Sequence, residues 1–256
     1  MDFTIHKYQQ LLDALKDSGI TFKLRHDVDL KPLNSLCTAK IEHSKGLSAT
    51  YYFRCVPESY DKEIILEIAK LGHEIGYHYE SLTTCHGDID AAYKDFTQNL
   101  QLLRQLAPIH SICMHGSPRS PWDSRDLWKR YDYRSLGIDH EPYFDTDFSK
   151  TLYLTDTGRR WDGFYVSLRD KIPQYQELWE KQGLVFHTTN PSISQLQEPQ
   201  SVLRQSGLSL LITTHPQRWN PVGLKHLMEY GSQGIKNIVK QIMVQHNNKN
   251  NNRGNN

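Results

Sequence analysis

The chain alternates between segments with helical apolar spacing and short runs of apolar or β-branched residues. In the first half, the helical segments carry apolar residues three or four positions apart and end near a glycine or a proline. These predicted helices cover residues 8–16, 32–45, 60–71 and 88–106. The runs between them predict strands at residues 20–24, 48–54, 73–80 and 109–114. Ser59 stands at the expected N-cap position of the helix at residues 60–71, and Asp88 is expected to start the last of these helices.

The second half of the chain shows weaker patterns. Residues 119–170 are rich in Trp, Tyr, Asp, Arg and Pro, which indicates long loops around a site and one short helix near residues 123–131. Further strands and helices are predicted by the same two patterns. The strands cover residues 153–155, 184–187 and 208–214, and the helices cover residues 194–206 and 222–245. The Asn-rich residues 247–256 predict a disordered tail.

The alternation of strands with helices predicts an α/β protein with a parallel sheet. Because no linker interrupts the pattern, we expect residues 1–246 to form one domain. A TIM-like (β/α) barrel is favoured over a doubly wound sheet. The first strand is not followed by a glycine-rich phosphate loop, which argues against a nucleotide cofactor.

Composition narrows the range of partners. The 30 basic and 29 acidic residues are mixed along the chain, so neither nucleic acid nor an anionic membrane is an expected partner. The start of the chain lacks a basic-then-apolar leader, and no apolar run approaches the length of a membrane span. The four cysteines form no Cys-x-x-Cys pair and are expected to be reduced thiols. These features predict a cytoplasmic protein.

The first candidate chemistry lies in Arg25-His26-Asp27-Val28-Asp29, which follows the first predicted strand. In extended geometry Asp27 and Asp29 point the same way, and two like charges so close repel each other. A divalent cation would remove that repulsion, with one Asp as a ligand and the other as a base. The alternative is a turn in which the two Asp residues cap the next helix.

Other ligating or proton-transferring residues also lie at or near the ends of predicted strands. They are His78, Glu80, His115, Asp156 and His215. Each of them alone has an ordinary explanation as a core or surface residue. In a parallel barrel, however, all carboxyl ends of the strands share one face, so residues far apart in sequence can converge there. The combination therefore indicates a site on that face.

Four stretches of the chain, in order, carry a resemblance to a known family. They are Leu24-Arg25-His26-Asp27-Val28-Asp29, Ala49-Thr50-Tyr51-Tyr52-Phe53, Gly72-His73-Glu74-Ile75-Gly76-Tyr77-His78 and Thr213-Thr214-His215-Pro216. In these stretches the chain resembles the NodB-type polysaccharide deacetylases (carbohydrate esterase family 4). It is most similar to a branch called WbmS-like, found with surface-polysaccharide biosynthesis. The resemblance covers about residues 20–220.

The resemblance implies a distorted (β/α)7 barrel and a divalent metal, usually zinc, held by one Asp and two His. It matches Asp27 to the catalytic base, Asp29 and His78 to metal ligands, and His215 to the general acid. The chain departs from the family where the second metal His is normally found, because that position is Leu82.

Two residues could replace the missing ligand, namely Glu80, which lies two positions after His78, and His115 after the fourth strand. We favour His115, since imidazole is the commoner zinc ligand. The Arg that orients the base in the family has no clear counterpart near His115.

We therefore expect a cytoplasmic, metal-dependent hydrolase of carbohydrate metabolism. It would remove the N-acetyl group of an amino sugar in a surface-glycan precursor. Alternatives are another barrel amidohydrolase acting on a non-sugar amide, and a barrel that has lost its metal and only binds a glycan. Loop residues such as Trp122, Tyr133, Tyr143 and Tyr153 could offer flat surfaces to a sugar, or could simply pack the loops. The candidate substrate-binding residues are Glu80, Asp156, Arg160, Trp161 and Trp219.

Overall fold

The computed structural model describes residues 2–117, 120–161, 167, 169, 171–186 and 189–220. Two compact units make up the chain. One comprises Lys23–Asp147 with Thr214–Gln217, here called the 23–147 unit. The other comprises Met1–Phe22, Phe148–Thr213 and Arg218–Asn256 and is called the 148–213 unit. The single domain expected over residues 1–246 remains a prediction.

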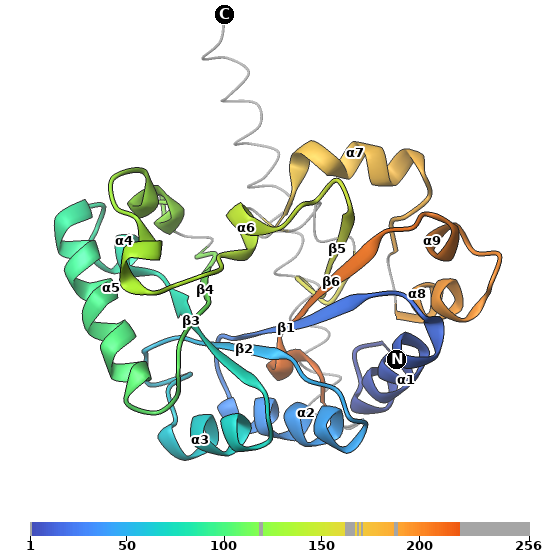
Figure 1. The fold of residues 1–256 in the computed structure, drawn as a ribbon, viewed down its shortest axis with the longest axis horizontal. Coiled ribbons are helices and arrows are strands. Elements are labelled where there is room, and N and C mark those ends of the chain that lie inside the picture. The colour runs from blue at the N-terminus through green and yellow to red at the C-terminus, as the bar shows by residue number, and fades with distance from the viewer. Residues whose placement is uncertain are drawn as a thin grey trace, which may run out of the picture. The chain divides into compact units, whose positions relative to one another are not determined.

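The 23–147 unit is built on parallel strands (Figure 1). They are β1 (Phe22–Val28), β2 (Thr50–Phe53), β3 (Glu74–Tyr79) and β4 (Ile112–Met114), in the spatial order β4-β3-β2-β1. The helices are α2 (Pro32–Ser44), α3 (Lys62–Lys70), α4 (Ser81–Thr84), α5 (Ile89–Arg104) and α6 (Pro142–Asp145). Three 3-10 turns are η1 (Ser124–Lys129), η2 (Tyr133–Leu136) and η4 (Pro216–Arg218), the last ending one residue beyond the unit.

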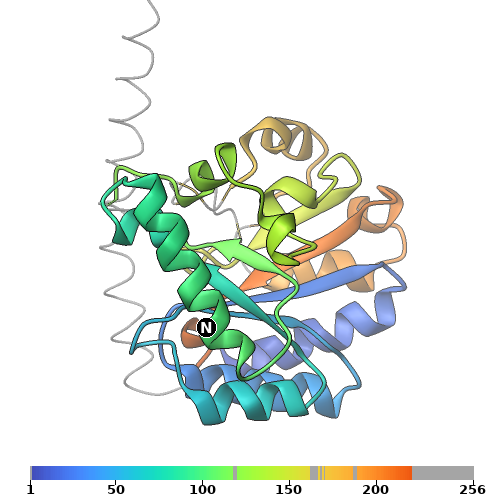
Figure 2. The ribbon, with the colours of Figure 1, turned by 60° about the vertical axis from the view of Figure 1, so that its left-hand side comes forward.

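Helices α2, α3 and α5 lie along one face of these strands, as Figures 1 and 2 both show. The last five residues of β1 are all buried, which is typical of a parallel strand covered on both faces. Gly76 of β3 is required by close packing, because a Cβ atom there would lie 2.4 Å from the ring of Tyr52. Strands β2 and β3 are therefore closely packed at this position.

The 148–213 unit contains the parallel strand pair β5 (Thr151–Thr155) and β6 (Ser209–Thr214). Its described helices are α1 (Ile5–Ser18), α7 (Pro173–Lys181), α8 (Thr189–Gln197) and α9 (Val202–Gln205). Helix α1 packs against α8. Phe3, Tyr8 and Trp219 form an aromatic cluster whose ring centroids lie 5.1 Å apart in two pairs. This cluster is part of the core of the unit.

These elements confirm the predicted α/β class. Most predicted helices and strands are present, with ends shifted by a few residues. The strand end that affects the site is that of β1. This strand was predicted to end at residue 24 but continues to Val28, so Asp27 lies inside the strand and not after it. None of the helices in the described part of the chain is long and apolar enough to cross a membrane.

Three predictions about local structure are wrong. Asp61, not Ser59, caps α3, because the Ser59 hydroxyl donates to the Val28 carbonyl instead. The helix predicted over residues 194–206 is broken into α8 and α9, since Pro199 lies between them and lacks an N–H group.

The third wrong prediction is the strand at residues 184–187, of which residues 184–186 carry no strand. Leu184 there donates its N–H to the Trp179 carbonyl and closes the end of α7 after Gly183, whose φ is +71°. Its burial therefore comes from a helix terminus. His187, the helix predicted at 222–245 and the tail at 247–256 lie outside the described residues.

Candidate metal centre

Three potential metal ligands come together at the carboxyl ends of the strands. Asp29 directly follows β1, His78 belongs to β3, and His115 directly follows β4. The distance from His78 Nε2 to Asp29 Oδ1 is 3.5 Å. The Nδ1 atom of His115 lies 3.2 Å from each of these two atoms. Two nitrogens and one oxygen thus form a nearly equilateral triangle.

The surroundings of His78 and Asp29 prepare these atoms to bind a cation. The Nδ1 atom of His78 lies 2.9 Å from the carbonyl oxygen of Cys113 and can donate a hydrogen bond to it, so Nε2 is the nitrogen that faces the triangle. Asp29 accepts a hydrogen bond from Gln217 at its Oδ2 atom, 3.2 Å away. Its buried Oδ1 atom has no hydrogen-bond partner among the described residues. Such an orphaned carboxylate oxygen fits a cation.

Electrostatics keep Asp29 in its ionised form. Burial raises the pKa of this carboxyl, but His115 and His78 outweigh burial and hold the pKa well below its usual range. A carboxylate that stays ionised at neutral pH is the form that binds metal.

Glu80, the other candidate third ligand, lies outside this triangle. Its Oε1 atom accepts hydrogen bonds from Arg54 Nε at 2.8 Å and from a terminal nitrogen of Arg54 at 2.6 Å. Its Oε2 atom lies 3.9 Å from His115 Nε2. Arg54 also donates to the carbonyl of Asp29, 3.0 Å away. Glu80 therefore lies on the Nε2 side of His115, away from the Nδ1 atom that faces the triangle.

Position 82 offers no ligand, since the side chain there is apolar and buried. Leu82 is 3% exposed and lies in the short helix α4.

Asp27, the expected base, is clamped by an arginine that sequence reasoning missed. Arg25 Nε donates to Asp27 Oδ1 at 2.8 Å, and a terminal nitrogen of Arg25 donates to Oδ2 at 2.7 Å. Burial raises the pKa of Asp27, but the charges of Arg25 and His78 hold it below its usual value. The pattern could have revealed this pair, because residues two apart in a strand lie on the same face.

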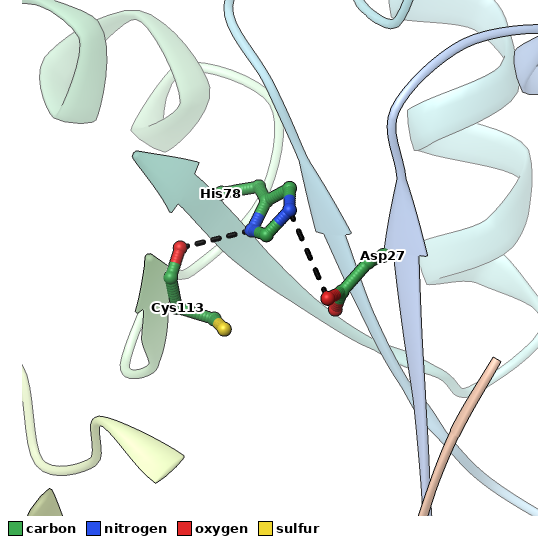
Figure 3. A group of neighbouring side chains, drawn as sticks. All are labelled: Asp27, His78 and Cys113. Carbon is green, nitrogen blue, oxygen red and sulfur yellow. Dashed lines mark hydrogen bonds and ion pairs between the residues drawn. The ribbon is translucent and has the colours of Figure 1, made fainter. Parts of the chain in front are cut away.

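Cys113 belongs to a second possible ligand group. Figure 3 shows His78 between Asp27 and the backbone of Cys113, with Nε2 directed toward Asp27. One atom each of Asp27, His78 and Cys113 lie within 4.8 Å of one another. Both oxygens of Asp27 are already bonded to Arg25, however, and the nearest one lies 3.8 Å from His78 Nε2. The group built on Asp29 is therefore better prepared for a cation.

His215 is placed beside this centre by a buried network. Its Nε2 atom lies 3.8 Å from Asp29 Oδ2. The preceding residue, Thr214, is 2.7 Å from Nδ1 of His26, and His26 Nε2 is 2.7 Å from Glu42 Oε1. His26, Glu42 and Thr214 are all fully buried. This network fixes the backbone that carries His215.

The remaining predicted site residues belong to the 148–213 unit. Asp156 is fully buried and accepts hydrogen bonds from Arg218 at 2.8 Å and from the Trp219 indole at 2.7 Å. Trp161 and Trp219 are 4% and 1% exposed, respectively. Their predicted stacking on a sugar is not supported, because their rings fill the core of that unit. Arg160 is half-buried, and its predicted role stays a prediction.

Comparison with protein families, with curated proteins and with solved structures finds no match to this chain.

Proposed function

We propose that this protein is a zinc-dependent hydrolase that removes the N-acetyl group of an amino sugar, as the sequence resemblance to NodB-type deacetylases implies. The proposal includes the distorted (β/α)7 barrel of that family and a surface-glycan precursor as substrate. The observation that carries it is the triangle of His78 Nε2, His115 Nδ1 and Asp29 Oδ1.

The dimensions of the triangle suit zinc. A tetrahedral zinc ion with bonds of about 2.0–2.1 Å has ligand atoms roughly 3.3–3.4 Å apart. The edges of the triangle are 3.2, 3.2 and 3.5 Å. Three protein ligands leave the fourth tetrahedral position open, which is the arrangement of catalytic rather than structural zinc sites.

The proposed chemistry divides between the ion and two side chains. Zinc at this site would supply an acidified water and polarise the acyl oxygen. Asp27, held ionised and oriented by Arg25, accepts the proton of the attacking water. His215 donates a proton to the nitrogen of the amide as its bond to the acyl carbon breaks. The products are acetate and the free amine of the sugar.

The alternative of a barrel without metal loses its main support in this arrangement. That alternative rested on the missing His at position 82, and in this proposal His115, 3.2 Å from Asp29, takes the place of that ligand. An amidohydrolase acting on a non-sugar amide would use the same centre, so only substrates distinguish it.

The test combines metal analysis with a substrate screen. The purified protein, reloaded with zinc, is expected to hold one ion, and Asp29→Ala, His78→Ala and His115→Ala are each expected to lose it. Cys113→Ser is the matched control, because it changes only the second ligand group, and it is expected to keep the ion. Acetate release is then measured on N-acetylated sugar nucleotides and oligosaccharides, and on non-sugar amides, with and without a chelator. A wild-type protein that retains no zinc would refute the proposal, and release from non-sugar amides alone would move it to the other amidohydrolases.

A further inference from the structure

Glu141 is a buried carboxyl outside the ligand triangle that the proposed reaction does not use. It is 0% exposed and caps the short helix α6. Its Oε1 atom accepts hydrogen bonds from the Met114 N–H at 3.1 Å and from the Tyr79 hydroxyl at 3.3 Å. Its Oε2 atom accepts from the Tyr143 N–H at 2.6 Å. Both oxygens are thus engaged with three separate segments.

Two of these partners adjoin residues of the metal centre. Met114 ends β4 and directly precedes His115. Tyr79 ends β3 and stands between His78 and Glu80. The Glu141 carboxyl therefore links the end of β3, which contains His78, to the end of β4, which precedes His115.

The third partner leads to the catalytic base. The ring of Tyr143 lies over the guanidinium of Arg25, whose Cζ atom is 5.2 Å from the ring centroid. Tyr52 covers Arg25 at 5.7 Å from its own centroid. Arg25 in turn holds both oxygens of Asp27. By its hydrogen bond to the Tyr143 backbone, Glu141 thus fixes one of the two rings that pack on Arg25, the residue that holds Asp27.

We propose that Glu141 is a positioning residue. In its ionised form it holds the end of β4, which carries His115, and the Arg25–Asp27 ion pair in the positions that the proposed reaction requires. This inference rests on the proposed function. If it is right, turnover depends on the ionisation of Glu141 in addition to the ionisations of the metal ligands and of the base Asp27.

The charge state of Glu141 is open to change near neutral pH. Burial raises the pKa of Glu141 to about 7, against the opposing effects of the Tyr143 N–H, Arg25 and Arg125. The other groups that face it are the Tyr79 hydroxyl and Asp145, which accepts the N–H of Glu141 at 2.7 Å. A protonated carboxyl has one hydroxyl oxygen, which donates and is a poor acceptor, so the three hydrogen bonds that Glu141 accepts are weaker when it is protonated.

The experiment compares Glu141→Gln with Asp145→Asn. Asp145 anchors the same α6 turn and bonds Tyr133 and Arg134, but it does not contact Met114, Tyr79 or the Tyr143 N–H in any described hydrogen bond. Cobalt affinity and its visible absorption are measured at pH 8. We expect Glu141→Gln to bind Co²⁺ about tenfold more weakly, the size of effect seen for groups that orient ligands, and Asp145→Asn to stay within about twofold.

Acetate release supplies the second measurement, as the ratio of kcat/KM between wild type and Glu141→Gln. Titration of the ligands and of the attacking water is common to both proteins and cancels in this ratio. We expect wild type to be about tenfold faster at pH 8 and less than about threefold faster at pH 6, where its Glu141 is protonated. A ratio that does not change with pH, or an Asp145→Asn protein that behaves like Glu141→Gln, would overturn the proposal.

A second pair of variants decides the matter if Glu141→Gln does not fold. Tyr143→Leu removes the ring over Arg25, whereas Tyr143→Phe keeps it. We expect Tyr143→Leu to lower kcat/KM about tenfold at unchanged Co²⁺ affinity, and equal rates in the two variants would remove the link to the base. If wild type binds no Co²⁺, the proposed function and this inference both fall. If it binds Co²⁺ but deacetylates nothing, only the proposed function falls, and the Co²⁺ affinities decide the role of Glu141.

Discussion

The buried carboxyl of Glu141 predicts a stability difference that is independent of any substrate. Its pKa is raised from 4.5 to about 7 in the folded protein. The folded state therefore binds this proton more tightly than the unfolded chain does. The stabilising contribution is complete below pH 4.5 and is lost as the pH rises through 7. At 1.36 kcal/mol per pH unit, the loss is about 3 kcal/mol.

Replacement of this residue should therefore change how stability varies with pH. Gln does not titrate, so the stability of Glu141→Gln relative to wild type should increase by about 3 kcal/mol between pH 4.5 and pH 8. For a protein of this size that corresponds to a change of roughly 6–12 °C in the difference between the two melting temperatures. The physical reason is that wild type must keep an ion in its interior above pH 7, and the variant does not.

Thermal unfolding of both proteins in chelator, at several pH values across this range, measures the difference. Chelator removes the contribution of metal binding. Asp27 and Asp29, whose pKa values are lowered, make both proteins less stable as the pH falls, and their effect cancels in the difference. A difference in melting temperature that stays constant with pH would refute the reasoning about Glu141.

Three other predictions concern the metal centre. His115→Ala should lose zinc, whereas Glu80→Gln should keep it with an affinity lowered by at most about 100-fold; metal analysis that gave the reverse order would make Glu80 the ligand. Leu82→His should not strengthen zinc binding and should lower stability by about 1–3 kcal/mol, because it places an imidazole in a packed apolar position; a large gain in zinc affinity by titration would contradict this. Asp27→Asn and His215→Gln should retain zinc but lower kcat by roughly 100-fold or more, and an unchanged rate in either would remove that residue from the mechanism.

Local sequence patterns were sufficient for most of the elements that build the site. Helix α5 begins directly after Asp88, which was predicted to start it and in fact caps it, and α2 begins at Pro32 as predicted. The same patterns placed Asp29, His78 and His115 at the ends of strands. These features depend on residues close in sequence, whose spacing can be read directly from the chain.

The choice between His115 and Glu80 required the tertiary structure. Both follow strands, and their spacing does not reveal which atom faces Asp29. Arg54, which follows β2, hydrogen-bonds Glu80 and holds it away from the triangle, and this contact favours His115 as the proposed third ligand. A partner contributed by a neighbouring strand cannot be read from the sequence around either candidate.

The structure was also needed to distinguish residues that pack the core from residues that could line a site. Trp161 and Trp219 resemble sugar-binding aromatics in sequence, yet their rings are buried in the core of the 148–213 unit. Leu184 resembles part of a strand, yet it closes a helix. Apolar and aromatic residues have the same identity in either role, and only the neighbours brought by the fold distinguish them.

What the sequence determined by itself is thus the alternation of strands and helices and the presence of acids and histidines at strand ends. What only the tertiary structure decided is which side chains come together. They are the triangle of Asp29, His78 and His115, and the ion pair of Arg25 with Asp27. The physical reason is range. Period and capping act within a few residues, whereas ligand geometry depends on strand register and side-chain rotamers that are fixed by packing across the whole unit.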